Sequence, residues 1–361
     1  KRLPQDGRTS MRINGHTVDV RVSTMPIQTG ESVVMRLLDQ SAGILTLDQM
    51  GMPSHLLTRF RRLLHRPHGM ILVTGPTGSG KTTTLYGALS ELNKPTTKII
   101  TVEDPVEYRL PRVNQVQTNN KIGLGFSEIL RTTLRQDPDI IMVGEMRDQE
   151  TAEIGLRGAL TGHLVLSTLH TNDAINSAVR LIDMGAPGYL VASSLRAMVA
   201  QRLVRKICEK CSEDYQLNTE ELLWMNSLDS NIKAINFKRG KGCQSCNSSG
   251  YKGRVGVFEL LEMTESMMNA LKVNDTVTFS QAARLSPGFV PLAKVALMYA
   301  KMGITSADEV LKLIETVADE RVMTHTHIDE TMEQDLTGSV IETNINQAQN
   351  AQPSRGDGGT V

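Results

Sequence analysis

The sequence predicts an α/β protein whose larger part is a parallel sheet covered by helices on both faces. From residue 54 onward, short apolar runs of strand length alternate with amphipathic segments of helix length. This alternation is typical of parallel sheets. One of the apolar runs, 70–74, leads into a glycine-rich loop and then into a predicted helix over 82–92. That order is typical of a phosphate-binding loop.

The residues before 54 predict β structure instead. Met11–Asn14 and Thr17–Ser23 alternate on either side of Asn14-Gly15, which is a strong hairpin signal, and Val33–Leu38 predicts a third strand. Residues 40–53 carry two glycines and a proline, and we expect them to form a hinge. The chain begins within this patterned segment and without methionine, so we expect further residues to precede it in the natural protein.

The remaining pattern defines the other elements. We expect a helix over 56–64 and buried strands at 98–102, 140–143 and 164–167. An insertion that carries all four cysteines spans about 205–255. Helices then follow, the last of which opens with the capping box Ser306–Glu309. The polar composition after residue 320 predicts a disordered tail.

Composition narrows the class of function. The 361 residues suffice for two or three domains, and 39 basic residues balance 39 acidic ones. Zero net charge and 4% aromatic residues count against a dedicated nucleic-acid binder. No apolar run reaches the roughly 18 residues that cross a bilayer, and no leader pattern is present. We therefore expect a cytoplasmic protein with reduced thiols.

The segment Gly75–Thr82 fits the P-loop pattern and lies between a predicted strand and a predicted helix. Glycines allow backbone N–H groups to surround phosphates, and the helix N-terminus adds positive potential. Lys81 would reach the β- and γ-phosphates, and the Thr82 hydroxyl would bind Mg²⁺. The residues predicted to bind the nucleotide here are Gly75, Pro76, Thr77, Gly78, Ser79, Gly80, Lys81, Thr82 and Thr83.

Two acidic elements follow predicted strands. Glu145 comes after 140–143, where many P-loop enzymes have aspartate, and it can hold the water shell of a metal or orient an attacking water. Glu103 and Asp104 follow 98–102. One carboxylate at a strand end is often only a helix cap. Two such elements beside one P-loop favour catalysis.

Two histidines, His163 and His170, flank the apolar run 164–167. Either one alone is more often a structural residue than a catalytic one. A neutral imidazole at a strand end can nevertheless sense a γ-phosphate by hydrogen bonding.

The four cysteines form two pairs with C-x₂-C spacing. Such pairs predict a tetrahedral Zn²⁺ site, since four thiolates satisfy the metal fully. A redox dithiol needs only one pair, and free thiols would not require this spacing. A closed site of this kind is structural and not catalytic. Its ligands would be Cys208, Cys211, Cys243 and Cys246.

Together these motifs resemble those of the secretion ATPase superfamily. Gly75–Thr82 resembles its Walker A motif, and Thr101–Glu107 resembles its Asp box. Gly144–Asp148 resembles the end of its Walker B motif, and Gly162–His170 resembles its His box. Segments Pro4–Arg8, Arg21–Pro26 and Gly30–Arg36 resemble the small domain before the motor in the ATPases of type II secretion and type IV pilus assembly. In detail the chain is similar to ATPases that assemble mannose-sensitive haemagglutinin pili.

The resemblance implies a RecA-like P-loop motor domain preceded by a small β-rich (α+β) domain, with a zinc-binding insertion and C-terminal helices. It implies a homohexameric ring that binds ATP, Mg²⁺ and Zn²⁺ and acts on an inner-membrane platform protein without nucleic acid. Arg21 and Arg36 match the arginine fingers of the family. Glu145 is favoured as the main catalytic carboxylate, with Glu103 as a helper.

The corresponding domain boundaries are 1–40 for the end of the small domain, 41–53 for the linker, 54–262 for the ATPase core with its insertion, 263–320 for the C-terminal helices and 321–361 for the tail. Two alternatives remain open. A pilus retraction ATPase shares the motifs, although retraction motors as a class lack the cysteine insertion. A nucleic-acid translocase also uses a P-loop. A non-hydrolysing paralogue is disfavoured, because Lys81 and Glu145 are both present.

Overall fold

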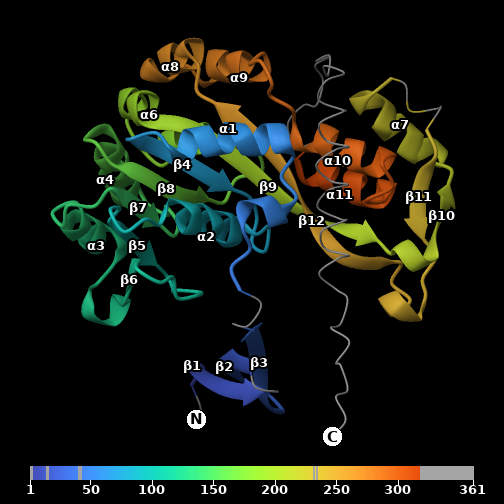
Figure 1. Cartoon of the computed structure of the whole chain (residues 1–361), viewed down its shortest axis with the longest axis horizontal. Coiled ribbons are helices and arrows are strands. Elements are labelled where there is room, and N and C mark those ends of the chain that lie inside the picture. Colours follow the sequence, from blue (N-terminus) through green and yellow to red (C-terminus); the bar gives the residue numbers. More distant parts are fainter. Residues whose placement is uncertain (1–2, 14–15, 40–42, 231, 233–234, 318–361) are drawn as a thin grey trace, which may run out of the picture. The chain divides into compact units, whose positions relative to one another are not determined.

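The computed structural model describes residues 3–13, 16–39, 43–230, 232 and 235–317 and contains two compact units, whose elements are labelled in Figure 1. The smaller unit comprises the described residues up to Leu45 together with Glu107–Arg109. The larger unit comprises the rest of the described chain. The predicted tail, 321–361, lies outside the described residues.

The smaller unit is a three-stranded antiparallel sheet in the order β1-β2-β3. Its strands are β1 (Gln5–Ile13), β2 (His16–Ile27) and β3 (Gly30–Asp39). Ile13 pairs with His16, and the residues predicted to form the turn, 14–15, lie outside the described part of the chain. Between residues 3 and 39 the described chain forms strands and no helix.

The larger unit is built on a seven-stranded sheet in the order β12-β9-β4-β8-β7-β5-β6. Strands β9, β4, β8, β7, β5 and β6 run parallel to one another. The strands are β4 (Gly69–Thr74), β5 (Ile99–Glu103), β6 (Asn114–Gln117), β7 (Ile140–Val143), β8 (Leu164–Leu169), β9 (Leu195–Ile207) and β12 (Tyr251–Glu262). The predicted parallel sheet is therefore present.

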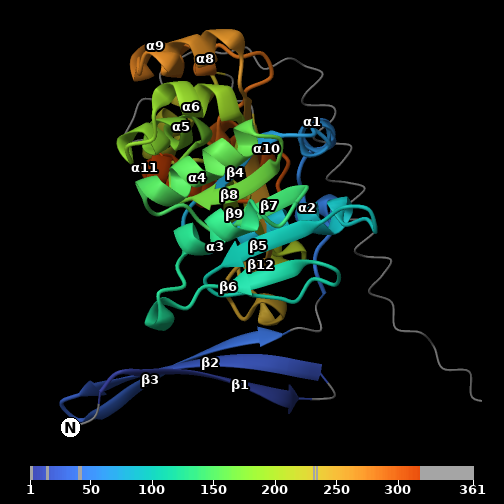
Figure 2. The ribbon, with the colours of Figure 1, turned by 90° about the vertical axis from the view of Figure 1, so that its left-hand side faces the viewer.

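Helices cover both faces of this sheet (Figure 2). The helices of the larger unit outside the insertion are α1 (Ser54–Leu64), α2 (Lys81–Leu92), α3 (Phe126–Thr133), α4 (Gln149–Leu160), α5 (Ala174–Asp183), α6 (Gly188–Ser194), α8 (Glu265–Lys272), α9 (Thr276–Arg284), α10 (Leu292–Lys301) and α11 (Ala307–Val317). Of these, α8 packs against α6, and α9 packs against α8. Short 3-10 helices occupy Leu47–Met50 and Asn120–Ile122.

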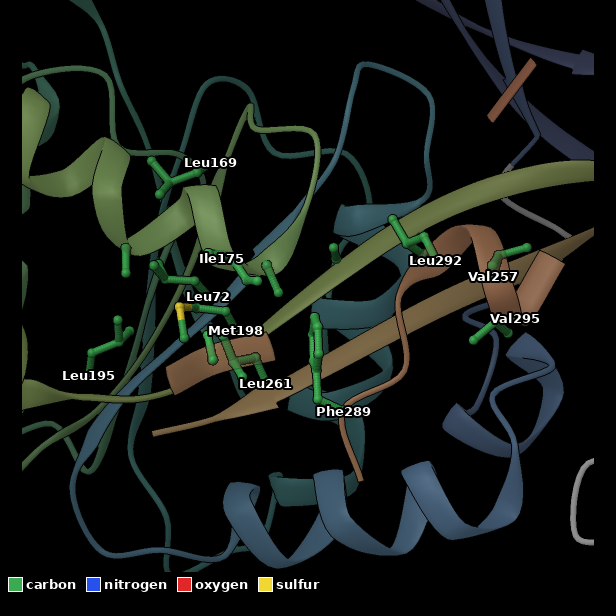
Figure 3. Close-up of a cluster of buried hydrophobic side chains, with 14 of the residues drawn as sticks. Leu72, Leu169, Ile175, Leu195, Met198, Val257, Leu261, Phe289, Leu292 and Val295 are labelled. Atoms are coloured by element: carbon green, nitrogen blue, oxygen red, sulfur yellow. The ribbon is translucent and has the colours of Figure 1, made fainter. Parts of the chain in front are cut away.

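Burial on both faces explains why the strands are continuously apolar. Met70–Val73 of β4 are all fully buried, and alternate residues of a strand face opposite sides. Met70 and Leu72 belong to the core cluster that includes residues of α4, α5 and α10. Figure 3 shows part of this cluster, in which Leu72 and Met198 lie near Leu261 and Ile175. At ~25 cal/mol per Å² of apolar surface, each such side chain contributes about 1.5–3 kcal/mol.

The structure differs from the sequence-based expectation in three places. β12 is antiparallel to β9, so the sheet has one antiparallel edge. The insertion is shorter than 205–255, because β9 continues to Ile207 and β12 begins at Tyr251. It contains β10 (Ser212–Tyr215), α7 (Thr219–Leu228), β11 (Phe237–Gly240) and short 3-10 helices at Glu209–Cys211 and Gln244–Cys246.

The third difference concerns the expected hinge. Contacts divide the chain after Leu45, within the segment 40–53. Leu47 and Met50 are buried in the larger unit, because the 3-10 helix that carries them packs against α2. The part of the expected hinge after Leu45 therefore belongs to the larger unit.

A buried carboxylate on β12 connects two helices. Glu259 is 2% exposed, and its two oxygens accept hydrogen bonds from the backbone N–H groups of Ala174 and Leu292, at 2.8 and 2.9 Å. These residues begin α5 and α10, so one side chain caps both N-termini. Burial, together with the nearby carboxylate of Asp173, raises the pKa of Glu259 to about 8, although the two N–H groups and Arg202 act in the opposite direction.

The substitution Glu259→Gln tests this double cap. A Gln amide offers only one acceptor oxygen, so one backbone N–H loses its partner, and we expect a loss of about 1–3 kcal/mol in the free energy of unfolding. Because the folded-state pKa of Glu259 is raised, the stability linked to its protonation is fully present below the unfolded-state pKa and is lost as pH rises through about 8.

The difference in the free energy of unfolding between wild type and Glu259→Gln should therefore decrease from pH 5 to pH 8. Urea unfolding followed by circular dichroism measures it. Glu262→Gln, on the same strand but paired with the partly exposed Arg59 and Arg62, is the matched control. It should cost less than about 1 kcal/mol. Equal losses for both variants would contradict the special role of Glu259.

Candidate active site

Most of the predicted site residues lie at one edge of the larger sheet. β4, β8, β7 and β5 are adjacent and parallel, so their carboxyl ends meet at the same edge. The P-loop follows β4, His170 follows β8, the turn with Glu145 follows β7, and Glu103 ends β5. Residues up to 95 positions apart in the sequence are therefore brought together by strand pairing.

Glycines permit the tight P-loop between β4 and α2. Gly75 has φ +148°, and a Cβ there would lie 2.4 Å from the carbonyl oxygen of Gln201 and 2.6 Å from Ser79 Oγ. Gly80 has φ +90° and caps α2, so its left-handed backbone also favours glycine. The loop is thus held against β9 on one side, and its backbone leads directly into the N-terminus of α2.

Two polar side chains of the loop are buried without an obvious structural reason. Ser79 Oγ has no hydrogen-bond partner among the described residues. Lys81 is 9% exposed, and its Nζ donates to the carbonyl oxygens of Gly75 and Pro76 at 2.8 and 3.0 Å. A cation folded onto its own loop and an unsatisfied hydroxyl both fit a loop that binds an anion. Thr82 is exposed in the first turn of α2.

Burial lowers the pKa of Lys81 to about 8. The carboxylate of Glu145 opposes this shift, and the charge of Arg202 adds to it. Glu145 therefore lies close enough to act electrostatically on the P-loop lysine.

Arg147 and His170 both contact the acidic residues at the strand ends. Its guanidinium is hydrogen-bonded to Glu145 and lies 3.7 Å from the carboxylate of Asp104. His170 Nε2 lies 3.5 Å from Glu145 Oε2. Burial and the charges of Lys81 and Arg147 lower the pKa of His170, although Glu145 acts in the opposite direction. Sequence reasoning assigned no role to Arg147.

Glu103 lies deeper than Glu145. It is 3% exposed, and its carboxylate accepts hydrogen bonds from Tyr86, Thr101 and Gln115. These donors were not identified from the sequence. Two of them, Tyr86 on α2 and Gln115 on β6, lie on different elements from Glu103. The structure also adds Gln201 and Arg202 of β9, of which Gln201 accepts from the Thr84 hydroxyl at 2.7 Å. A Gln-Arg pair within the otherwise apolar run 197–204 of β9 was the available signal.

The structure does not bring His163 to this edge. His163 precedes β8, whereas the P-loop is aligned with the other end of that strand, since Thr74 pairs with Leu169. The ring Nδ1 of His163 lies 2.9 Å from the carbonyl oxygen of Gly158, a partner in α4. Six residues of strand, about 20 Å, separate the two ends.

The predicted arginine fingers lie in the smaller unit. Arg21 and Arg36 pair directly across β2 and β3, and Arg8 pairs with Arg21 across β1. Directly opposite residues share one face, so the three arginines form a row. Arg21 also donates to Glu107 Oε1 at 3.2 Å within this unit. Like charges opposite one another repel, and such a row suits an anionic ligand.

The four cysteines form one cluster, with all Sγ atoms within 4.8 Å of one another. Measured separations are 3.9 Å for Cys208–Cys243, 3.8 Å for Cys211–Cys246 and 3.7 Å for Cys243–Cys246. A tetrahedral site with Zn–S bonds of about 2.3 Å requires sulfur separations of about 3.8 Å. Backbone N–H groups of Gly242 and Cys243 also point at Cys211 and Cys246. The cluster is compatible with zinc.

A RecA-like sheet whose central strand leads into a P-loop, with carboxylates at the neighbouring strand ends, defines a P-loop nucleotide-binding protein. Residues 1–312 match the family described as Type II/IV secretion system protein. The chain belongs to this family.

Curated relatives agree with the family. Type II secretion system ATPase E of Vibrio cholerae is 46% identical over 315 residues, which are 87% of this chain and 62% of that protein. Type II secretion system protein HxcR of Pseudomonas aeruginosa is 45% identical over 313 residues, 87% of this chain and 63% of that protein. The chain thus spans about three-fifths of the length of these relatives.

Solved structures are similar in fold. The crystal structure of the pilus retraction motor PilT with bound ADP has a TM-score of 0.60 and 27% identity, covering 85% of this chain and 77% of that one. The X-ray structure of the ATPase DotB of Legionella pneumophila has a TM-score of 0.62 and 22% identity. The match covers 86% of this chain and 77% of that chain. Among the described residues, no helix has the length and apolar character that a membrane span requires.

The lowered pKa of Lys81 predicts how nucleotide binding depends on pH. Polyphosphates bind the charged ammonium, and in the free protein this ammonium loses its proton above about pH 8. We expect the affinity for ADP to fall by up to about tenfold per pH unit from pH 8 to 10. Calorimetric titration of the protein with ADP between pH 7 and 10 measures this affinity. Lys81→Ala should bind weakly without this dependence, and a constant wild-type affinity across the range would contradict the prediction.

Proposed function

We propose that this chain is the nucleotide-hydrolysing part of a ring-forming motor ATPase that powers type II secretion or type IV pilus assembly. The observation that carries the proposal is the convergence of the P-loop with Glu103, Glu145 and His170 at one sheet edge. The family match and the curated relatives support it. The ring, the inner-membrane platform protein and a place on the cytoplasmic face of the membrane belong to the same proposal.

The reaction is transfer of the γ-phosphoryl group of ATP to water. Backbone N–H groups of the P-loop and Lys81 bind the β- and γ-phosphates, and the Thr82 hydroxyl, with Glu145, holds Mg²⁺. Bound there, Mg²⁺ would neutralise charge that develops on the phosphates. The sequence favoured Glu145 as the main catalytic carboxylate; we propose instead that Glu103 orients the attacking water, with Asp104 and His170 near the γ-phosphate. His163 is left out of this site because of its position at the other end of β8.

Arg21 and Arg36 complete the site as arginine fingers. An arginine that reaches a γ-phosphate contributes on the order of 10³- to 10⁵-fold in rate. Closure of the smaller unit on ATP, and its release after hydrolysis, would convert this chemistry into movement. A pilus retraction motor remains the alternative within the family, and the cysteine insertion favours secretion or assembly. A nucleic-acid translocase is the alternative from another class.

The decisive measurement is ATP hydrolysis as a function of protein concentration, with and without DNA. Wild type should hydrolyse ATP with a specific rate that rises with concentration, as assembly of a ring requires. Lys81→Ala, Glu145→Gln and Arg21→Ala should each lower kcat at least 100-fold, and Glu145→Gln should still bind ATP. Lys272→Ala, an exposed substitution on α8, is the control. Turnover that ignores Arg21 and increases strongly with DNA would favour a translocase instead.

We further propose that the cysteine cluster binds one structural Zn²⁺. Anaerobically purified protein should contain one zinc per chain by elemental analysis, and Cys243→Ser should contain far less. Because the metal would hold only the insertion, its loss should raise protease sensitivity between 208 and 250 and leave ADP binding within about twofold. Ser245→Ala, in the same loop but outside the cluster, should keep its zinc. Full zinc content in Cys243→Ser would refute the assignment.

A further inference from the structure

The carboxylate of Glu103 is unusual among the groups at the sheet edge because protein donors surround it. Glu145, Asp104 and His170 are partly accessible, whereas Glu103 is 3% exposed and Tyr86 is 1% exposed. A buried carboxylate of this kind is costly unless hydrogen bonds satisfy it. The donors that bind the Glu103 carboxylate determine which of its acceptor positions remain for a ligand.

The three donors come from three different elements. Thr101 of β5 and Gln115 of β6 both donate to Glu103 Oε1, the latter at 3.2 Å. Tyr86 of α2 donates to Oε2. The backbone N–H of Leu110 donates to Gln115 Oε1 at 2.7 Å, so the amide orientation is determined and its NH₂ faces the carboxylate.

An ionised carboxylate has about four acceptor positions, two on each oxygen. The described donors occupy both positions of Oε1 and one of Oε2. The remaining position is on Oε2, whose direction depends on the hydroxyl of Tyr86. A water molecule that Glu103 orients must therefore bind Oε2 beside Tyr86.

Tyr86 and Glu103 are also close to the other parts of the site. Tyr86 lies on the helix that begins with Lys81, little more than one turn after the P-loop. A Cβ at Gly144 would lie 3.4 Å from Glu103 Cα, which places the turn that carries Glu145 against Glu103. The Tyr86–Glu103 hydrogen bond thus joins the phosphate-binding helix to the strand end that carries the carboxylate.

We propose that Tyr86 is a positioning residue for hydrolysis: its hydroxyl holds Glu103 so that Oε2 binds the attacking water. In that step the water oxygen forms a bond to the γ-phosphorus, and the bond from this phosphorus to the β–γ bridging oxygen breaks. The electron pair leaves with ADP, and the water proton passes to Glu103 Oε2. This inference rests on the proposed ATPase function, and Gln115 acts in the same way on Oε1.

A purely structural role makes a different prediction. If Tyr86 only satisfies a buried carboxylate, Tyr86→Phe should lower the melting temperature and leave the kinetics of the folded protein unchanged. If Tyr86 positions Glu103, kcat should fall about 10- to 100-fold while KM for ATP stays within about twofold, since the phosphates bind elsewhere. ADP binding should remain intact in either case.

The experiment measures kcat, KM and melting temperature for wild type, Tyr86→Phe, Glu103→Gln and the double variant, at one protein concentration. Tyr299→Phe is the matched control, because Tyr299 is equally buried and its hydroxyl donates to the carbonyl of Gly51 at 3.1 Å. It should change stability without changing kcat. In the Glu103→Gln background, Tyr86→Phe should cause no further loss of kcat, because both changes act through one carboxylate.

Three results would overturn the inference: unchanged kcat in Tyr86→Phe, a rise in KM that accounts for its loss of activity, or a full additional loss in the double variant. If Tyr86→Phe does not fold, Gln115→Leu takes its place with the same expected split between kcat and KM. Absence of any Lys81-dependent hydrolysis in wild type would overturn the proposed function and this inference together. Lys81-dependent hydrolysis that Tyr86→Phe leaves unchanged would overturn the inference alone.

Discussion

The parallel pairing of β4 with β8 on one side and β9 on the other is the constraint on which the site depends. It places the P-loop in the interior of the sheet, where the ends of its neighbours surround it. His170 then emerges one strand away, and the turn with Glu145 follows on the next strand. Since hydrogen bonds between parallel strands fix their relative register, the site geometry follows from backbone pairing before any side chain interacts.

The site collects buried polar groups that would be costly in an ordinary core. Lys81 binds carbonyl oxygens of its own loop, and Glu103 accepts three hydrogen bonds. Each group is compensated by protein partners, so the protein can keep charge in a poorly solvated place. The same low solvation strengthens the interaction of these groups with a charged substrate, which is the usual source of electrostatic catalysis.

The insertion contributes in a different way. It lies between β9 and β12, and its Met225, Leu228, Ile232 and Phe237 are buried in the core cluster of the larger unit. The two turns that carry the cysteines, 208–211 and 243–246, have only polar residues between their cysteines, and a cluster of four thiols at separations that suit a tetrahedral metal can hold these turns together. The motor strands on either side would then keep their pairing even where the insertion itself is altered.

The sequence by itself determined the parallel α/β class, the position of the P-loop, the strand-end acids and the pairing of the cysteines, because each depends on local pattern and spacing. Only the tertiary structure decided which residues meet. It made β12 antiparallel, separated His163 from His170 by the length of one strand, and brought Tyr86 and Gln115 to Glu103. The side chains of the expected capping box also have other partners. Glu309 accepts a hydrogen bond from Arg205, and Ser306 Oγ lies 2.7 Å from the Tyr251 hydroxyl. Local pattern sets the type and extent of each strand and helix, whereas contacts between distant residues depend on register and crossover, which no short segment encodes.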